Sequence, residues 1–309
     1  MIQKIQTEKY WERMISRSKD TVFLRREQLS IIFLLTEKLK LLNMKHDYTK
    51  TINAFTKKFL KKEKVLAVLV TGSFAQGTNN KDSDLDIQII TSNTCKFRKR
   101  GNIVMDGILI EYCINPYRQV KKYLEIDAKH NNPMMCIALL EGKIIFEKYK
   151  SASLLKEYAA ACLRNEYNSI NKDRISFNKY VLADTLNKMN SLYKKHRDDF
   201  PFLYYINLKL IYETYAVFLQ QPLLKEPMLK DYFEGNVRFN HVLKDFIDKE
   251  FAKMFLLAMV SKNSQDQIVK YRELTQYVLN KMGGFSLDGW SLRIPVDYGN
   301  KMDKRTRIF

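Results

Sequence analysis

The chain has 309 residues, of which 46% are hydrophobic and 12% are aromatic. That length is about twice the size of a common domain, so it predicts two domains or one domain with a helical extension. The apolar content excludes a disordered chain, because enough large side chains are available to offset the entropy of ordering. Only 10 Gly and 6 Pro residues are present, which favours long helices over a turn-rich all-β fold.

Basic residues exceed acidic residues, with 53 Lys and Arg against 34 Asp and Glu and a formal net charge of +19. The excess is spread along the whole sequence and is not gathered in a tail. Such a charge attracts polyanions, whether a nucleoside triphosphate, tRNA or an anionic membrane. Solvated helix faces of a Lys-rich protein explain it equally well, so the charge alone names no partner.

The cysteines and the N-terminus predict a soluble, cytoplasmic protein. The four cysteines are widely spaced and form no CxxC pair, which indicates reduced thiols and neither a zinc site nor a disulfide framework. The N-terminus, MIQKIQTEKYWERM, carries charges throughout and lacks the apolar core of a signal peptide. The most apolar stretch, Leu203–Leu219, contains Asn207, Lys209 and Glu213, so it predicts a buried helix and no membrane span.

The first 62 residues have the pattern of helices. Ser30–Met44 repeats apolar side chains near the 3.6-residue period of a helix. A second helix is predicted over Thr49–Lys62, where Ile52, Phe55 and Phe59 fall on one face.

The next segment changes to strand patterns. Val65–Val70 is a short apolar run typical of a buried strand, and Leu85–Thr91 alternates apolar and polar residues. The charged run Lys96–Arg100 and the following Gly101–Asn102 predict an exposed turn. Beyond it, Ile103–Met105 and Ile108–Ile114 predict a hairpin, because Asp-Gly between them is a strong signal for a two-residue turn.

The remainder of the chain is predicted to be mainly helical. A helix is expected over residues 117–128 and a short strand over 143–146, followed by helices from 151 to about 282 and an extended tail. We therefore expect three parts: an N-terminal helical segment (1–45), a domain with a mixed sheet (46–150) and a helical C-terminal domain with its tail (151–309).

Two aspartates stand at the start of the second predicted strand. Asp84 and Asp86 are two residues apart, and residues i and i+2 of a strand point to the same face. Two carboxylates held this close repel each other, and a divalent cation between them removes the repulsion. Mg²⁺ prefers carboxylate and phosphate oxygens, so the pair predicts a magnesium site that also binds a phosphorylated ligand.

Three further residues complete this candidate site. Gly72 lets the backbone approach a ligand closely, and Ser73 offers a hydroxyl and an N–H group to a phosphate near the start of a helix. Glu111 is a charge inside an apolar run, where a lone carboxylate is rarely buried without a partner or a metal. Its strand could place it against the two aspartates as a third acid.

These residues carry a resemblance to a known family. Gly72–Ser73, ten further residues, Asp84-Leu85-Asp86 and the later Glu111 resemble the nucleotidyltransferase superfamily with the DNA polymerase β-like fold. Within it, GSFAQGTNNKDSDLDI is similar to the GSxAxGxxxxxSDLD-like pattern of bacterial minimal and antibiotic-modifying nucleotidyltransferases. The similarity is strong over Leu69–Ile114 and softer at the junction with the helical half.

The resemblance implies an α+β fold, with a polymerase-β-like mixed sheet, N-terminal helices and an all-α C-terminal domain. It implies that Asp84 and Asp86 bind Mg²⁺, and that Glu111 is a third metal ligand and the general base. Gly72 and Ser73, with the two aspartates, would hold the nucleotide. Two Mg²⁺ ions are expected, and ATP or another nucleoside triphosphate is the expected substrate.

The acceptor of the transferred nucleotide stays open at this stage. One hypothesis is a small hydroxylated molecule, such as an antibiotic, in which case the protein would confer antibiotic resistance. The alternatives are nucleotidylation of tRNA or of a protein, as in toxin-type relatives, and a non-catalytic sensor that only binds a nucleotide. The oligomeric state does not follow from the sequence.

Overall fold

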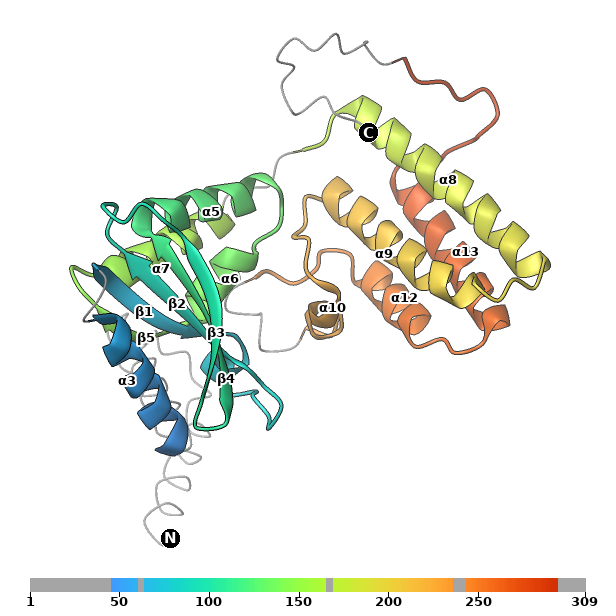
Figure 1. The fold of residues 1–309 in the computed structure, drawn as a ribbon. Coiled ribbons are helices and arrows are strands. Elements are labelled where there is room, and N and C mark those ends of the chain that lie inside the picture. Colours follow the sequence, from blue (N-terminus) through green and yellow to red (C-terminus); the bar gives the residue numbers. More distant parts are fainter. Residues whose placement is uncertain (1–45, 61–63, 165–168, 236–242, 294–309) are drawn as a thin grey trace, which may run out of the picture. The chain divides into compact units, whose positions relative to one another are not determined.

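The computed structural model describes residues 46–60, 64–164, 169–235 and 243–293 (Figure 1). The chain divides into two compact units, residues 1–58 and residues 59–309, and each is described by itself. The predicted helix Ser30–Met44 and the predicted segment 1–45 lie outside the described residues.

Most of α3 (His46–Leu60) belongs to the first unit. It confirms the helix predicted over Thr49–Lys62, although it begins three residues earlier. Ile52 and Phe55 are 2% and 1% exposed. Their spacing of three residues places them on one face of the helix, as the apolar pattern predicts.

The second unit begins with a five-stranded mixed sheet. Its strand order is β3-β4-β2-β1-β5, with β2 and β4 parallel and the other neighbours antiparallel. The strands are β1 (Val65–Thr71), β2 (Leu85–Thr91), β3 (Lys99–Met105), β4 (Ile108–Pro116) and β5 (Lys143–Glu147). The predicted α+β class with a mixed sheet is therefore confirmed.

The β3–β4 hairpin corrects one prediction and confirms another. Asp106 and Gly107 both have positive φ angles, 52° and 76°, as the predicted two-residue turn requires. The prediction of an exposed turn over Lys96–Arg100 and Gly101–Asn102 is wrong from Lys99 onward, because β3 begins at that residue. Charged residues are common on an exposed edge strand, so their charge alone did not distinguish a turn from an edge.

Four helices accompany the sheet in sequence. They are α4 (Gly72–Gln76), α5 (Tyr117–Lys129), α6 (Met134–Glu141) and α7 (Ser151–Arg164). The last three share one apolar core with β1 and β2, and the members of this core include Ala67, Leu69, Ile90, Leu124, Leu139, Leu155 and Ala159. The Oγ of Ser151 also donates a hydrogen bond of 2.9 Å to the carbonyl oxygen of Leu66. α7 thus packs on the sheet, and the boundary between residues 150 and 151 stays a prediction.

From residue 169 to residue 282 the described chain is mainly helical, as predicted. It contains α8 (Lys172–Lys194), α9 (Phe200–Phe218), α10 (Glu226–Phe233), α12 (Lys249–Met259) and α13 (Ser264–Lys281). Pro201 and Pro227 lie in the first turn of α9 and of α10, where a missing N–H costs no helical hydrogen bond. These helices enclose a core rich in aromatic side chains, among them Tyr204, Tyr212, Tyr215, Phe251, Phe255 and Tyr271.

Asp248 links α9, α12 and α13 through hydrogen bonds. It caps α12 by accepting a hydrogen bond of 3.0 Å from the N–H of Phe251. It also accepts one of 2.6 Å from the hydroxyl of Tyr215 on α9 and one of 2.9 Å from that of Tyr277 on α13. Burial alone would raise the pKa of Asp248, but these three donors outweigh it and hold the pKa below its usual value.

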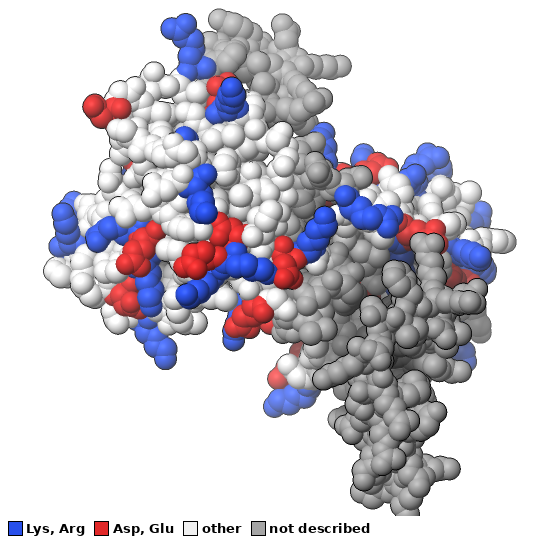
Figure 2. All heavy atoms as spheres, turned by 180° about the vertical axis from the view of Figure 1, so that it is seen from behind, with Lys and Arg blue, Asp and Glu red and all other residues white. Residues whose placement is uncertain are grey.

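Three features concern the described residues as a whole: helix hydrophobicity, the cysteines and the surface charge. None of the described helices is both long and apolar enough to cross a membrane. The four cysteines carry free thiols, and Cys136 and Cys162 are buried. On the described surface that Figure 2 presents, Lys and Arg alternate with Asp and Glu and form no continuous basic stripe.

Candidate active site

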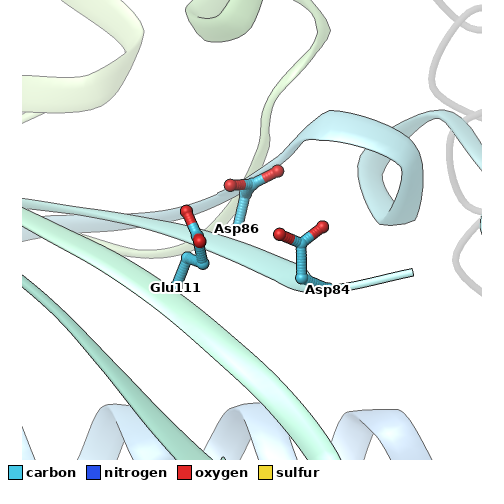
Figure 3. A group of neighbouring side chains, drawn as sticks. All are labelled: Asp84, Asp86 and Glu111. Atoms are coloured by element: carbon cyan, nitrogen blue, oxygen red, sulfur yellow. The ribbon is translucent and has the colours of Figure 1, made fainter. Parts of the chain in front are cut away.

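The structure brings the three predicted acids together at one end of the sheet. Asp84 directly precedes β2, and Asp86 lies within it. In the parallel pairing of β2 and β4, Glu111 is the register partner of Asp86. One carboxylate oxygen from each residue lies within 4.8 Å of the others, and Figure 3 shows the three side chains rising from the same side of neighbouring strands.

Electrostatics make this cluster costly in the absence of a cation. Asp86 is half-buried, and this burial raises the pKa of its carboxyl group. The negative charges of Asp84 and Glu111 raise the same pKa further, while the Arg100 guanidinium opposes the change. The charged form of a half-buried carboxylate held beside two other acids is what a bound divalent cation stabilises.

Arg100 is a residue of the site that sequence reasoning missed. Its guanidinium, on β3, lies 2.9 Å from the carboxylate of Glu111, and the Arg100 side chain is 75% exposed. The hairpin register could have revealed this pair, because Arg100 is paired with Cys113, two residues from Glu111 on the same face.

Gly72, in the Gly-Ser turn of the motif, lies directly beside Asp86, in its Asp-x-Asp part. It follows the end of β1 with a φ of +65°, and a Cβ atom built on it would lie 2.3 Å from Oδ2 of Asp86. Any side chain at this position would therefore collide with a carboxylate of the cluster. Ser73 comes next, in the first turn of α4, and Gly77 ends that helix with a φ of 73°. The predicted phosphate contacts of Gly72 and Ser73 remain a proposal.

Asn80 orders the loop that leads to Asp84. Its side-chain Oδ1 accepts a hydrogen bond of 2.9 Å from the N–H of Asp82, and its carbonyl accepts one of 3.2 Å from the N–H of Ser83. Its own N–H donates to the hydroxyl of Ser83 at 2.9 Å. Asn is a common turn residue for this reason, and the NNKDSD sequence carries that signal.

The donor set fits the metal that the motif predicts. All three residues of the cluster offer carboxylate oxygens, and no nitrogen or sulfur ligand belongs to the group. Hard cations such as Mg²⁺ prefer this set, whereas zinc sites usually include His or Cys. The clustering of the acids is thus shown, and their metal-binding and catalytic roles remain proposals.

The fold and the site define a class of protein. A mixed sheet with a Gly-Ser turn after β1, two aspartates at the start of β2 and a glutamate on the neighbouring β4 resembles the arrangement of a nucleotidyltransferase. Residues 53–151 match the family model described as polymerase beta, nucleotidyltransferase. These residues form a nucleotidyltransferase domain of the polymerase β-like superfamily, and the chain is a nucleotidyltransferase enzyme.

Two individual proteins are also similar to this chain. A curated relative from Methanocaldococcus jannaschii, named as a predicted protein adenylyltransferase, is 29% identical over 109 residues, which cover 32% of this chain and 74% of the relative. A crystal structure of a nucleotidyltransferase-like protein from Exiguobacterium sibiricum aligns with a TM-score of 0.40 at 10% identity. That alignment covers 74% of this chain and 73% of the other.

Proposed function

We propose that the protein transfers AMP from ATP to a hydroxyl group and releases pyrophosphate, with Mg²⁺ as the metal. The observation that carries this proposal is the cluster of Asp84, Asp86 and Glu111 beside Gly72, because three close carboxylates supply the ligands of a hard cation and a glycine at this turn leaves the backbone open to a phosphate. ATP is the default donor of the superfamily, and the name of the curated relative also points to AMP transfer.

The residues of the cluster have separate roles in this proposal. Asp84 and Asp86 hold the cation, two ions being expected, which neutralises the triphosphate and orients it for attack. Gly72 and Ser73 face the phosphates at the start of α4. Glu111 receives the proton of the acceptor hydroxyl. The oxygen of that hydroxyl bonds to the α-phosphorus, and the bond from this phosphorus to the pyrophosphate breaks. A positioned general base of this kind contributes about 10²–10⁴-fold to a rate.

Arg100 fits this scheme as a residue that orients Glu111. The Nη2 of Arg100 contacts Oε2 of Glu111, which leaves the other carboxylate oxygen able to face the aspartates. Charge-assisted contacts of this type fix a carboxylate in one orientation.

Three acceptor classes remain candidates. The helical region that follows the sheet supports a small hydroxylated acceptor, such as an antibiotic, because it supplies additional surface that could enclose one. The name of the relative from M. jannaschii supports a hydroxyl on a protein. tRNA is the third candidate, and the net charge of +19 favours it, whereas the face shown in Figure 2 mixes acidic and basic side chains.

The reaction can be tested without knowledge of the acceptor. ATP with Mg²⁺ should raise the midpoint of thermal unfolding, because a ligand that binds only the folded state stabilises it by about 2.7 kcal/mol at 100 times its Kd. Label from α-labelled ATP should then appear in an acceptor. A non-catalytic sensor would show the thermal shift without any transfer of label from ATP in the presence of antibiotics, proteins or tRNA.

A further inference from the structure

The face of the sheet that carries Glu111 continues onto an exposed surface of the β3–β4 hairpin. Alternate residues of a strand share a face, so Leu109 lies beside Glu111 on β4. Their register partners on β3 are Val104 and Asn102. Val104 is 66% exposed and Leu109 is 41% exposed. Val104 and Leu109 therefore form an exposed aliphatic pair, and Leu109 is two residues from Glu111 on the same face of β4.

The strand β3 is also an edge of the sheet. Its one strand neighbour is β4, and within the described residues no strand pairs with its other side. Backbone N–H and C=O groups on such an edge are a template for another strand, which proteins usually protect. Exposed aliphatic side chains next to a free edge are typical of a site for an extended peptide, because the backbone supplies affinity and alternate side chains supply specificity.

This surface suits a macromolecule better than a small molecule. Sites for small molecules usually enclose about 70–90% of the ligand surface. An edge strand with Val104 two-thirds exposed offers no such enclosure at this point. A polypeptide gains its affinity from extended contact with open surfaces of this type.

The charge of the edge indicates the chemistry of the segment. Four of the five residues over Lys96–Arg100 are basic and exposed, and the run leads directly into β3. Arg100 is paired with Glu111, and Arg98 donates a hydrogen bond to the hydroxyl of Tyr123. Lys96 and Lys99 add two further positive charges. An acidic segment complements this end of the strand, while the aliphatic pair near Glu111 does not favour the stacking that RNA bases require.

We infer that the acceptor of this enzyme is a hydroxyl on an extended, acidic polypeptide segment that docks along β3 and over Val104 and Leu109. The inference rests on the proposed function, since Glu111 is the group that meets the hydroxyl. Strands in a sheet lie about 4.8 Å apart, so a segment added to β3 would lie about 10 Å from β4. Of the three hydroxyl side chains, Ser, Thr and Tyr, tyrosine reaches furthest toward Glu111 from a strand at that distance, and it is therefore the hydroxyl to test.

The test uses the full chain, α-labelled ATP, Mg²⁺ and synthetic nine-residue peptides. In the first peptide, Glu alternates with Val around a central Tyr; in the second, Lys replaces Glu; in the third, Phe replaces Tyr. Val104→Glu introduces a negative charge that repels the acidic peptide. Leu154→Glu, on α7, is the matched control, because Leu154 is 47% exposed and lies outside the hairpin.

The expected result is label on the acidic Tyr peptide, about tenfold less label on the basic peptide, and none on the Phe peptide. Val104→Glu should lower labelling about tenfold, which corresponds to about 1.4 kcal/mol, and Leu154→Glu should leave it unchanged. Val104→Glu should also keep the thermal shift caused by ATP and Mg²⁺, because Val104 is outside the acid cluster.

Three outcomes would overturn the inference while leaving the proposed function intact. They are equal labelling of the acidic and basic peptides, equal loss of label in both variants, and label that reaches only an antibiotic or tRNA in a panel of acceptors. Failure of the wild type to show any thermal shift with ATP and Mg²⁺ would instead contradict the proposed function, and the inference with it.

Discussion

A Cβ atom on Gly72 would lie 2.3 Å from Oδ2 of Asp86, closer than any real Cβ contact. The turn after β1 and the carboxylate on β2 therefore occupy the same small volume, and Thr71 and Asp86 are register partners in the two strands. This contact explains the number of residues between Gly72 and Asp86 in the motif. The chain between β1 and β2 has to be long enough to bring Asp86 back beside Gly72, the residue proposed to contact a phosphate.

Gly72→Ala should impair the site beyond its effect on the backbone. Alanine in a left-handed conformation costs about 1–2 kcal/mol, and the added methyl group must also displace the Asp86 carboxylate. We expect lower stability together with loss of the thermal shift caused by ATP and Mg²⁺. Differential scanning fluorimetry, with and without the ligands, measures both effects.

Gly77→Ala is the matched control for this variant. Gly77 has a φ of +73°, but nothing lies within 4 Å of a Cβ atom built on it. The control should lose a similar amount of stability and keep the ligand-dependent shift. If Gly72→Ala kept the shift as fully as Gly77→Ala does, the close approach to Asp86 would have no part in binding.

Asp86→Asn should make the protein more stable without ligands and unresponsive to metal. The pKa of Asp86 is raised above 3.8 by burial and by its acidic neighbours, so the folded state binds this proton more tightly than the unfolded state. Stability therefore falls as the pH rises from about 3.8 through the raised pKa, and the ionised group destabilises the fold at neutral pH.

Thermal unfolding of Asp86→Asn at several pH values measures this effect. The midpoint at pH 7 without metal should rise by about 2–4 °C for each kcal/mol of repulsion removed. The advantage over the wild type should shrink below about pH 4, where the carboxyl group is protonated in both states. If the variant were less stable than the wild type at pH 7, the Asp86 side chain would stabilise the fold, and its ionised carboxylate would not destabilise it.

Asp248→Ala should destabilise the helical region. It leaves the buried hydroxyl of Tyr215 and the N–H of Phe251 without their acceptor, which costs about 1–3 kcal/mol for a buried group. The pKa of Asp248 is lowered, so its contribution is present above about pH 3.8 and is lost as the pH falls through the lowered value.

The control for Asp248→Ala is Asp245→Ala. Asp245 forms an ion pair with Lys249 whose side chains are 51% and 61% exposed, and such pairs contribute about 0–1 kcal/mol. Chemical denaturation at pH 7 should show a large loss for Asp248→Ala only, and that loss should become smaller as the pH falls below about 3.8. Equal losses for both variants would contradict the stabilising role of the network around Asp248.

Glu111→Gln separates two roles of the third acid. If Glu111 is mainly the general base, nucleotide binding survives while AMP transfer falls about 10²–10⁴-fold. If it mainly binds metal, the thermal shift with ATP and Mg²⁺ falls as well. Turnover within a few-fold of the wild type would show that neither role is right.

Much of this site follows from sequence because its signals are local. The apolar run before Gly72, the Asp-x-Asp spacing and the Asp-Gly turn each specify a backbone conformation within a few residues. The charge of Glu111 inside an apolar run predicted a third acid facing the two aspartates, but the parallel pairing that sets Glu111 against Asp86 joins strands that are distant in sequence and was not predicted.

Other features depended on contacts that no local pattern contains. α6 (Met134–Glu141) was not predicted, and Asp127 of α5 stabilises its start by accepting hydrogen bonds from Met135 and Cys136. The pairing of Arg100 with Glu111 needed the hairpin register. The packing of α7 on the sheet likewise depends on a core shared by distant segments.

The most direct test of the account follows label from α-labelled ATP in the wild type and in Asp86→Asn. Reactions contain Mg²⁺ and the acidic tyrosine peptide or a panel of hydroxylated antibiotics, and pyrophosphate is measured in parallel. The account predicts that the wild type transfers label with an equal amount of pyrophosphate, that chelation of Mg²⁺ stops the transfer, and that Asp86→Asn shows none. Transfer by Asp86→Asn at the wild-type rate would contradict the account.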